Sequence, residues 1–197
     1  MALEFYACGH RGRRDGCARV RHVLERGIGM PESRMRTIED IAREMRERKL
    51  LLATAESCTA GLIAAMLADV EGAGALLDCA FVVYSPDAKR HALGVPERIL
   101  RTYNLTSEHV ARAMGRGALA RSRANVAIAN TGVADGGGDG VAAGTQCYAW
   151  VFRGGEGKIA VYSETRRFPG GRNAVRERAA RHALERLPYY ADLAART

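Results

Sequence analysis

The sequence predicts an α/β protein, a layered α/β/α domain with a mixed sheet and a late β-hairpin. Two observations predict this fold. Helical and strand patterns alternate between residues 37 and 130, as in domains whose helices cover a central sheet. Two strand patterns then follow, at 145–152 and 158–168, and the short RGGEG segment between them predicts a hairpin. A hairpin added to alternating elements indicates a sheet with parallel and antiparallel parts.

The first half of the predicted domain is read from apolar spacing and from prolines. Ile38, Ile41 and Met45 recur on one face of a helix. Pro86 and Pro96 stand where short helices open, because a proline fits the first helical position. The expected elements are a helix over 37–48, a strand over 50–54, a helix over 59–69, a strand over 79–85 and short helices over 86–95 and 96–104.

The second half begins with a long helix in which Ser107 is a suitable N-cap and Glu108 suits the first turn. The apolar run ANVAIAN predicts the next strand, and a glycine-rich loop separates it from the hairpin. The expected elements are a helix over 107–124, a strand over 124–130, a loop over 131–144, the two hairpin strands and a closing helix over 170–187.

The composition is that of a globular protein, with 47% hydrophobic and 26% charged residues among 197. No stretch approaches the roughly 20 apolar residues that a membrane span needs, and the first residues lack the pattern of a secretory signal. We expect a cytoplasmic protein with no membrane partner. Residues 1–35 are expected to be a flexible extension, or an over-long start with Met30 or Met35 as the true initiator, and 36–197 the domain.

The cysteines and the charge exclude some functions. Five widely spaced cysteines do not suit a disulfide framework, and Cys8, His10 and Cys17 have no fourth ligand at a useful spacing. A metal site at these residues is therefore not expected. A net charge of +8 suits nucleic acid, a phosphate-bearing small molecule or a solvated arginine-rich face. Nucleic acid is disfavoured, because no aromatic residues are interleaved with the arginines.

Lysine usage is unusual. Only Lys49, Lys89 and Lys158 are lysines, so 27 of the 30 basic residues are arginines. Arginine cannot lose its proton in a protein, whereas a buried lysine can. A retained lysine therefore points to proton chemistry, although chance retention is an open alternative.

The stretch ATAESCTAGLIAA, residues 53–65, carries the chemistry. It is expected to run from a strand through a polar turn into a helix, with Ser57, Cys58 and Thr59 at the turn. Unpaired N–H groups at a helix start can stabilise an oxyanion, hold a phosphate or activate a nucleophile. Ordinary helix capping by serine or threonine explains the same spacing.

Three blocks in order resemble one known family. AESCTAG, then FVVYSPDAKRHALGV, then ANVAIANTGVADGG and AAGT resemble the CinA C-terminal-domain family over roughly residues 37–187. The resemblance implies a nicotinamide-nucleotide amidase that hydrolyses the carboxamide of nicotinamide mononucleotide to nicotinate mononucleotide and ammonia. It also implies a homo-oligomer, a role in recycling pyridine nucleotides, and a reaction that uses no metal or organic cofactor.

The resemblance places the catalytic serine of the family at Ser57, its tyrosine at Tyr84 and its lysine at Lys89. A serine hydroxyl needs a base, and Lys89 serves if burial lowers its pKa. Tyr84 is expected to face the same pocket and to relay or donate a proton. Cys58 is the alternative nucleophile. The residues expected to contact substrate are Glu56, Cys58, Thr59, Gly61, Thr131, Gly132 and Arg172.

The glycine loop departs from the family pattern. GVADGGG lacks the family proline, and Asp135 stands where a glycine is usual. A negative charge there opposes a substrate phosphate, which Arg172 is expected to bind. An amidase acting on another small molecule, or a non-catalytic nucleotide-binding protein with the same fold, are therefore alternative interpretations.

Overall fold

The computed structural model describes residues 36–136 and 140–196. The predicted extension over 1–35 lies outside the described residues, so the domain boundary at 36 stays a prediction. Within the described ranges no helix is both long and apolar enough to cross a membrane.

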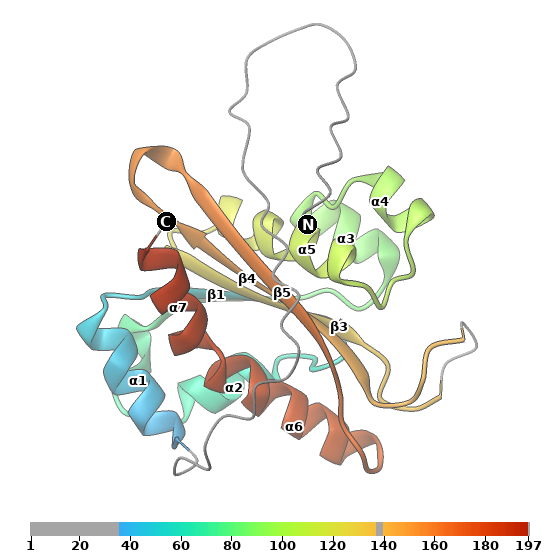
Figure 1. Ribbon diagram of the computed structural model, residues 1–197, viewed down its shortest axis with the longest axis horizontal. Coiled ribbons are helices and arrows are strands. Elements are labelled where there is room, and N and C mark those ends of the chain that lie inside the picture. Colours follow the sequence, from blue (N-terminus) through green and yellow to red (C-terminus); the bar gives the residue numbers. More distant parts are fainter. Residues whose placement is uncertain (1–35, 137–139, 197) are drawn as a thin grey trace, which may run out of the picture.

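A five-stranded mixed sheet forms the centre of the domain, as predicted, in the order β2-β1-β3-β4-β5. β1 pairs in parallel with β2 and β3, whereas β3–β4 and β4–β5 are antiparallel. β4 and β5 form the predicted hairpin (Figure 1). The strands are β1 (Leu52–Glu56), β2 (Leu77–Val82), β3 (Val126–Gly132), β4 (Thr145–Arg153) and β5 (Ile159–Arg167).

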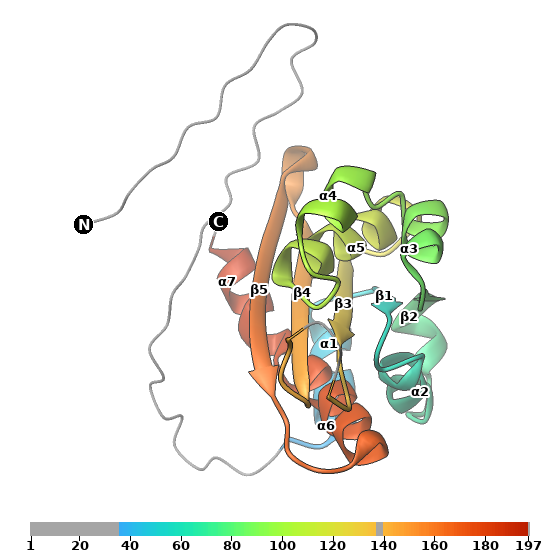
Figure 2. The same ribbon diagram turned by 90° about the vertical axis from the view of Figure 1, so that its right-hand side faces the viewer.

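Helices cover both faces of the sheet (Figure 2). One layer contains α1 (Ile38–Glu47), α2 (Leu62–Ala68), α6 (Arg172–Glu185) and α7 (Leu187–Ala195). The other contains α3 (Pro86–Leu93), α4 (Glu97–Thr102) and α5 (Glu108–Ala120). Two short 3₁₀ turns are η1 (Ala73–Ala75) and η2 (Gly155–Gly157).

The alternation of side chains along β4 separates the two cores. Tyr148 and Trp150 are fully buried on the α6 face, where they donate hydrogen bonds to the Ala179 and Ala183 carbonyls at 3.1 and 3.0 Å. The opposite face carries small residues, and α5 lies close to it. A Cβ at Gly115 would come within 2.7 Å of Val151, so this close packing requires a glycine.

Several element boundaries differ from the sequence expectations: β2 spans Leu77–Val82 rather than 79–85, α2 begins at Leu62 rather than at 59, and α5 ends at Ala120 rather than at 124. The first strand runs to Glu56 rather than to residue 54, because β1 pairs with β2 and β3 along its whole length. The closing helix ends at Glu185, and a further helix, α7, follows with Pro188 in its first turn. No helix was expected from the sequence after residue 187. The apolar side of α7 nevertheless buries Leu187 and Tyr190.

The carboxyl ends of the three parallel strands meet at one edge of the sheet. Glu56 is in register with Val82 on one side and Asn130 on the other. The segments that follow β1, β2 and β3 therefore start side by side. Such an edge is where open α/β sheets place their ligands.

Candidate active site

Ser57 is the first residue after β1. Its backbone N–H donates to the Asn130 carbonyl at 3.0 Å, which extends the pairing with β3 by one residue. The side chain is almost buried, with 8% of the residue exposed. The position of Ser57 is therefore fixed by the sheet rather than by a loose turn.

Lys89 lies one turn into α3 and points at Ser57. The helix begins where it does because Ser85 caps it, accepting from the Ala88 N–H at 3.0 Å, and Pro86 occupies its first turn. The Lys89 amine contacts the Ser57 hydroxyl at 2.9 Å. It also donates to the Val83 and Tyr84 carbonyls, each at 3.0 Å.

The environment of Lys89 suits a base. Only 1% of the residue is exposed, and this burial lowers the pKa of its amine from 10.5 to about 8. At pH 7, a pKa of about 8 leaves roughly a tenth of the protein with the neutral amine. This fraction is far larger than for a solvated lysine.

Glu56 caps a helix instead of facing a ligand. Its two carboxylate oxygens accept from the N–H groups of Gly61, Ile63 and Ala64 at 2.8–3.1 Å, and the residue is fully buried. The start of α2 thus already binds a carboxylate. This corrects the expectation that its N–H groups would stabilise a substrate anion and that Glu56 would contact substrate.

The turn between β1 and α2 uses left-handed backbone conformations. Ala60 has φ 49° and Gly61 has φ 95°. The Gly61 conformation costs a glycine nothing, whereas Ala60 is strained, and the family pattern has glycine at that position. The turn brings Thr59 and Cys58 inward, with 0% and 6% of each residue exposed.

Cys58 is held as a neutral thiol. Burial raises the pKa of its thiol, although hydrogen bonding from the Gln146 amide, at 3.3 Å, lowers it in part. The Cys58 side chain therefore contributes packing beside Ser57. As a substrate-binding residue it has little exposed surface to offer.

Three residues that the sequence analysis did not single out support the turn. Arg176, on α6, donates to the Cys58 and Thr59 carbonyls at 3.0 and 3.3 Å. The Asn130 side chain accepts from the Thr59 N–H and donates to Gln146. Asn130 and Gln146 are polar residues in otherwise apolar strands, a signal that was available in the sequence, whereas Arg176 is one arginine among many.

Tyr84, Arg172 and Asp135 meet at the surface beside this turn. Arg172 donates to the Tyr84 hydroxyl at 2.9 Å and to the Asp135 carboxylate at 2.7 Å. Tyr84 is 59% exposed. Its carbonyl, not its hydroxyl, is the group that contacts Lys89.

A model of the CinA C-terminal domain matches residues 35–190. The chain belongs to the CinA C-terminal domain family. The resemblance inferred from the three sequence blocks is confirmed.

CinA relatives carry different names. The nicotinamide-nucleotide amidohydrolase PncC of Escherichia coli K12 is 37% identical over 157 residues, covering 78% of this chain and 92% of that protein. A CinA-like protein of Akkermansia muciniphila is 37% identical over 193 residues, covering 87% of this chain and 46% of that protein. The chain spans less than half the length of several relatives that it matches.

Solved CinA structures share the fold. A competence damage-inducible protein A from Klebsiella pneumoniae has a TM-score of 0.74 at 35% identity, over 79% of this chain and 95% of that chain. A competence/damage inducible protein from Agrobacterium tumefaciens has a TM-score of 0.69 at 40% identity, over 78% and 94%. The layered α/β architecture is thus that of the CinA superfamily.

The residues that open the CinA glycine loop have structural contacts. The Thr131 hydroxyl donates to the Leu105 carbonyl at 2.8 Å, and 2% of the residue is exposed. A Cβ at Gly132 would come within 2.4 Å of the Gln146 amide, so the residue must be glycine. Neither contact presents a group to a ligand, which differs from the substrate-binding role expected for both.

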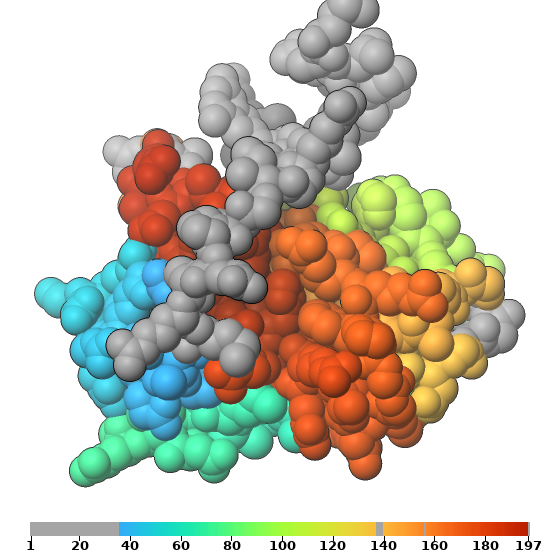
Figure 3. Space-filling model, turned by 60° about the horizontal axis from the view of Figure 1, so that its bottom comes forward, coloured from blue at the N-terminus to red at the C-terminus, as the bar shows by residue number. Residues whose placement is uncertain are grey.

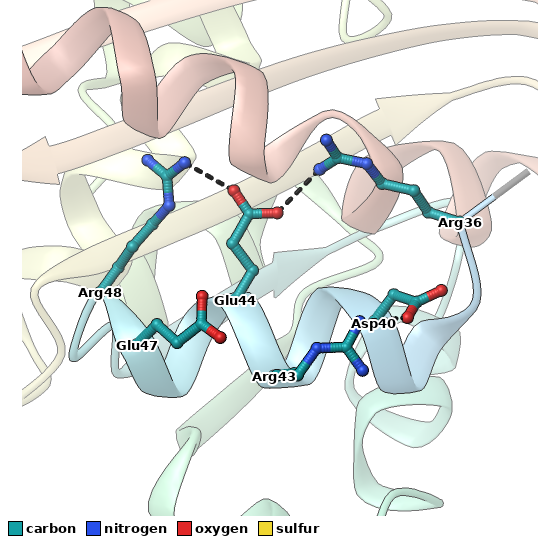
Figure 4. A pocket seen from close by; sticks show the side chains of 6 residues that line it. All are labelled: Arg36, Asp40, Arg43, Glu44, Glu47 and Arg48. Carbon is teal, nitrogen blue, oxygen red and sulfur yellow. Dashed lines mark hydrogen bonds and ion pairs between the residues drawn. The ribbon is translucent and has the colours of Figure 1, made fainter. Parts of the chain in front are cut away.

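Two shallow surface hollows lie apart from Ser57. One, of about 350 Å³, is lined by charged side chains around α1, and Glu44 lies between Arg36 and Arg48 with an ion pair to each (Figure 4). The other, of about 390 Å³, lies between Ala143 and the segment 167–170. Within the described ranges no group of three His, Cys, Asp or Glu side chains could hold a metal ion.

Proposed function

We propose that the chain hydrolyses the carboxamide of a nicotinamide nucleotide, with Ser57 as nucleophile and Lys89 as base. The observation that carries this proposal is the buried contact of 2.9 Å between the Lys89 amine and the Ser57 hydroxyl. The name of the PncC relative supports the substrate. Ser57 attacks the carbonyl carbon, Lys89 takes its proton and returns it to the departing ammonia, and water then hydrolyses the acyl-enzyme.

The contacts of Lys89 set the direction of proton transfer. The Val83 and Tyr84 carbonyls can only accept hydrogen bonds, so they hold two N–H groups whatever the charge on the amine. When the amine loses its third proton, the lone pair faces the remaining partner, the Ser57 hydroxyl. The neutral form is thereby oriented for base catalysis.

A donor for the oxyanion is available in the same turn. The amides of Ser57, Thr59 and Ala60 donate to protein oxygens. In the part of the chain that the structure describes, the amide of Cys58 makes no such bond. We assign this N–H, next to the nucleophile, to the negative oxygen that develops in the transition state.

The raised pKa of the Cys58 thiol supports Ser57 over Cys58 as nucleophile, because only the thiolate attacks efficiently. Tyr84 has a hydroxyl in contact with Arg172, so we assign it to the substrate side of the site. A relay of the Ser57 proton through that hydroxyl receives no support from this arrangement.

Ammonia release from nicotinamide mononucleotide tests the proposal. Wild-type protein is expected to release ammonia and nicotinate mononucleotide, and Ser57→Ala to lose roughly 10³-fold or more in kcat. Cys58→Ala is the matched control, because it truncates the neighbouring side chain of similar size. It should retain most of the rate.

Two outcomes would contradict the proposal. If Cys58→Ala abolishes turnover and Ser57→Ala does not, the nucleophile is misassigned. If wild-type protein releases no ammonia from the nucleotide, the substrate is wrong. A panel of other small amides then tests the second candidate, an amidase for another substrate, which the Asp135–Arg172 ion pair favours.

A further inference from the structure

Three polar side chains from connections that are distant in sequence meet on the surface beside the Ser57 turn. Tyr84 follows β2, Asp135 lies in the loop after β3, and Arg172 opens α6. The Asp135 loop and the β5–α6 turn adjoin on the surface (Figure 3). Tyr84 connects the two groups of contacts, because its hydroxyl accepts from Arg172 at 2.9 Å and its carbonyl accepts at 3.0 Å from the Lys89 amine that contacts Ser57.

We infer that Asp135 determines substrate preference, by competing with a phosphate group of the substrate for the guanidinium of Arg172. This rests on the proposed function, and it concerns which substrates that site accepts. The consequence is that the site discriminates against phosphate monoester dianions and in favour of amides that carry less negative charge.

The charges support this direction. One terminal nitrogen of Arg172 donates to the Asp135 carboxylate and the other to the Tyr84 hydroxyl. Both terminal nitrogens of the fork that would bind phosphate bidentately are therefore engaged. A phosphate dianion must displace the carboxylate, or remain beside it against repulsion between like charges.

The exposure of the pair sets the size of the effect. The Asp135 and Arg172 side chains are 58% and 54% exposed. An ion pair this exposed is weak, so Asp135 lowers phosphate affinity without closing the site. The expected penalty is about fivefold in affinity, equivalent to about 1 kcal/mol. The Tyr84 contact keeps Arg172 oriented when the carboxylate withdraws.

Calorimetric titration with ribose 5-phosphate, and with ribose as the uncharged probe, tests the inference on the full chain. Asp135→Asn keeps the shape of the side chain and removes its charge. It should bind ribose 5-phosphate about fivefold more tightly than wild type, with no change for ribose. The gain should shrink at high salt, where the charges are screened.

Asp87→Asn is the matched control. Asp87 also pairs with an arginine, Arg90, at 3.2 Å, and its side chain is 81% exposed at the start of α3. The substitution changes the net charge equally but leaves Arg172 untouched. An equal gain in the control would overturn the inference, as would unchanged affinity in Asp135→Asn or no measurable binding of ribose 5-phosphate to that variant.

A kinetic experiment separates this inference from the proposed function. Nicotinamide mononucleotide and nicotinamide riboside share the carboxamide and differ in the phosphate. Asp135→Asn should lower KM for the nucleotide about fivefold, leaving kcat and the riboside values unchanged. If wild type hydrolyses neither compound, the proposed function fails, and the titration alone then decides the role of Asp135.

Discussion

Lys89 is the residue whose protonation controls the proposed reaction. Its pKa is lowered to about 8 because it is buried, so the amine is mostly charged below that pH and neutral above it. The base must be neutral. We predict that kcat/KM rises about tenfold per pH unit below pH 8 and levels off above it, as a pH–rate profile would measure.

Lys89→Arg provides the comparison, because a guanidinium keeps the positive charge at every accessible pH. The variant should be inactive across the whole range. A wild-type profile that is flat between pH 6.5 and 9 would show that no group with the pKa of Lys89 limits the rate.

Ala60 is strained, since an alanine with φ 49° suffers a clash that glycine avoids. We predict that Ala60→Gly raises the free energy of unfolding by about 1 kcal/mol, measured by urea denaturation. The matched control is Ala65→Gly in α2, where the same substitution should lower stability by about 1 kcal/mol. Equal losses in both variants would mean that the strain at Ala60 is negligible.

At the scale of elements, α6 positions the turn that carries Ser57. Arg176 donates from this helix to the carbonyls of Cys58 and Thr59. We predict that Arg176→Met lowers kcat roughly tenfold with little change in KM, because hydrogen bonds of a charged donor are lost but no proposed substrate contact is. Steady-state kinetics with the substrate of the proposed function measure both constants.

Arg178→Met is the control on the same helix, since Arg178 binds the Pro169 carbonyl instead of the turn. It should leave kcat unchanged. Arg176→Lys should recover only part of the rate, because one ammonium cannot reproduce the two-carbonyl contact of the guanidinium. If Arg178→Met reduces kcat as much as Arg176→Met does, the loss is caused by removing a positive charge from α6 and not by losing the contacts with the turn.

Most helices and strands could be predicted from the sequence because their signals are local. The apolar run of the first hairpin strand and the cap at Ser107 act within a few residues, so the sequence reveals them. The start of α2 was misjudged because its cap is the Glu56 carboxylate, which precedes the helix and lies on a strand. Capping of that kind has no fixed spacing.

At the scale of the whole molecule, a partly buried cluster of polar side chains joins β5 to α6 and α7. The Glu164 carboxylate accepts from His182 and from the Tyr190 hydroxyl, and Arg186 lies at 3.3 Å. Burial alone would raise the pKa of Glu164, but the hydrogen bonds from His182 and Tyr190 and the nearby charges lower it from 4.5 to about 2.

A lowered carboxyl pKa means that the folded protein binds fewer protons than the unfolded chain between pH 4.5 and 2. The stability from Glu164 is thus complete above pH 4.5 and is lost as the pH falls to about 2. We predict that Glu164→Gln has a lower free energy of unfolding than wild type at pH 7. The difference between the two proteins should narrow as the pH falls from 4.5 to about 2. Denaturation at several pH values measures it.

Glu177→Gln, on the exposed side of α6, controls for the loss of one carboxylate and should track wild type. A constant gap between Glu164→Gln and wild type from pH 7 to pH 2 would contradict the prediction. It would mean that the carboxyl group titrates equally in the folded and unfolded states.

The site was only partly predictable, because its contacts join distant parts of the chain. Ser57 and Lys89 could be predicted from the family blocks. The structure adds that the Lys89 amine lies 2.9 Å from the Ser57 hydroxyl. The bonds from Gln146 to Cys58 and from Arg172 to Tyr84 each span 88 residues, so no local pattern reports them. Homo-oligomer formation stays a prediction.

The carboxyl edge of the sheet carries one buried pair of site residues and one exposed pair, and this difference has an evolutionary consequence. The Ser57 backbone is hydrogen-bonded to β3, and Lys89 is buried against Ser57, so the surrounding structure holds both residues in place. Asp135 and Arg172 lie on exposed connections, where substitutions cost little. Substitutions at these exposed positions can therefore alter which substrates the proposed site accepts, one residue at a time, without disturbing the contact between Ser57 and Lys89.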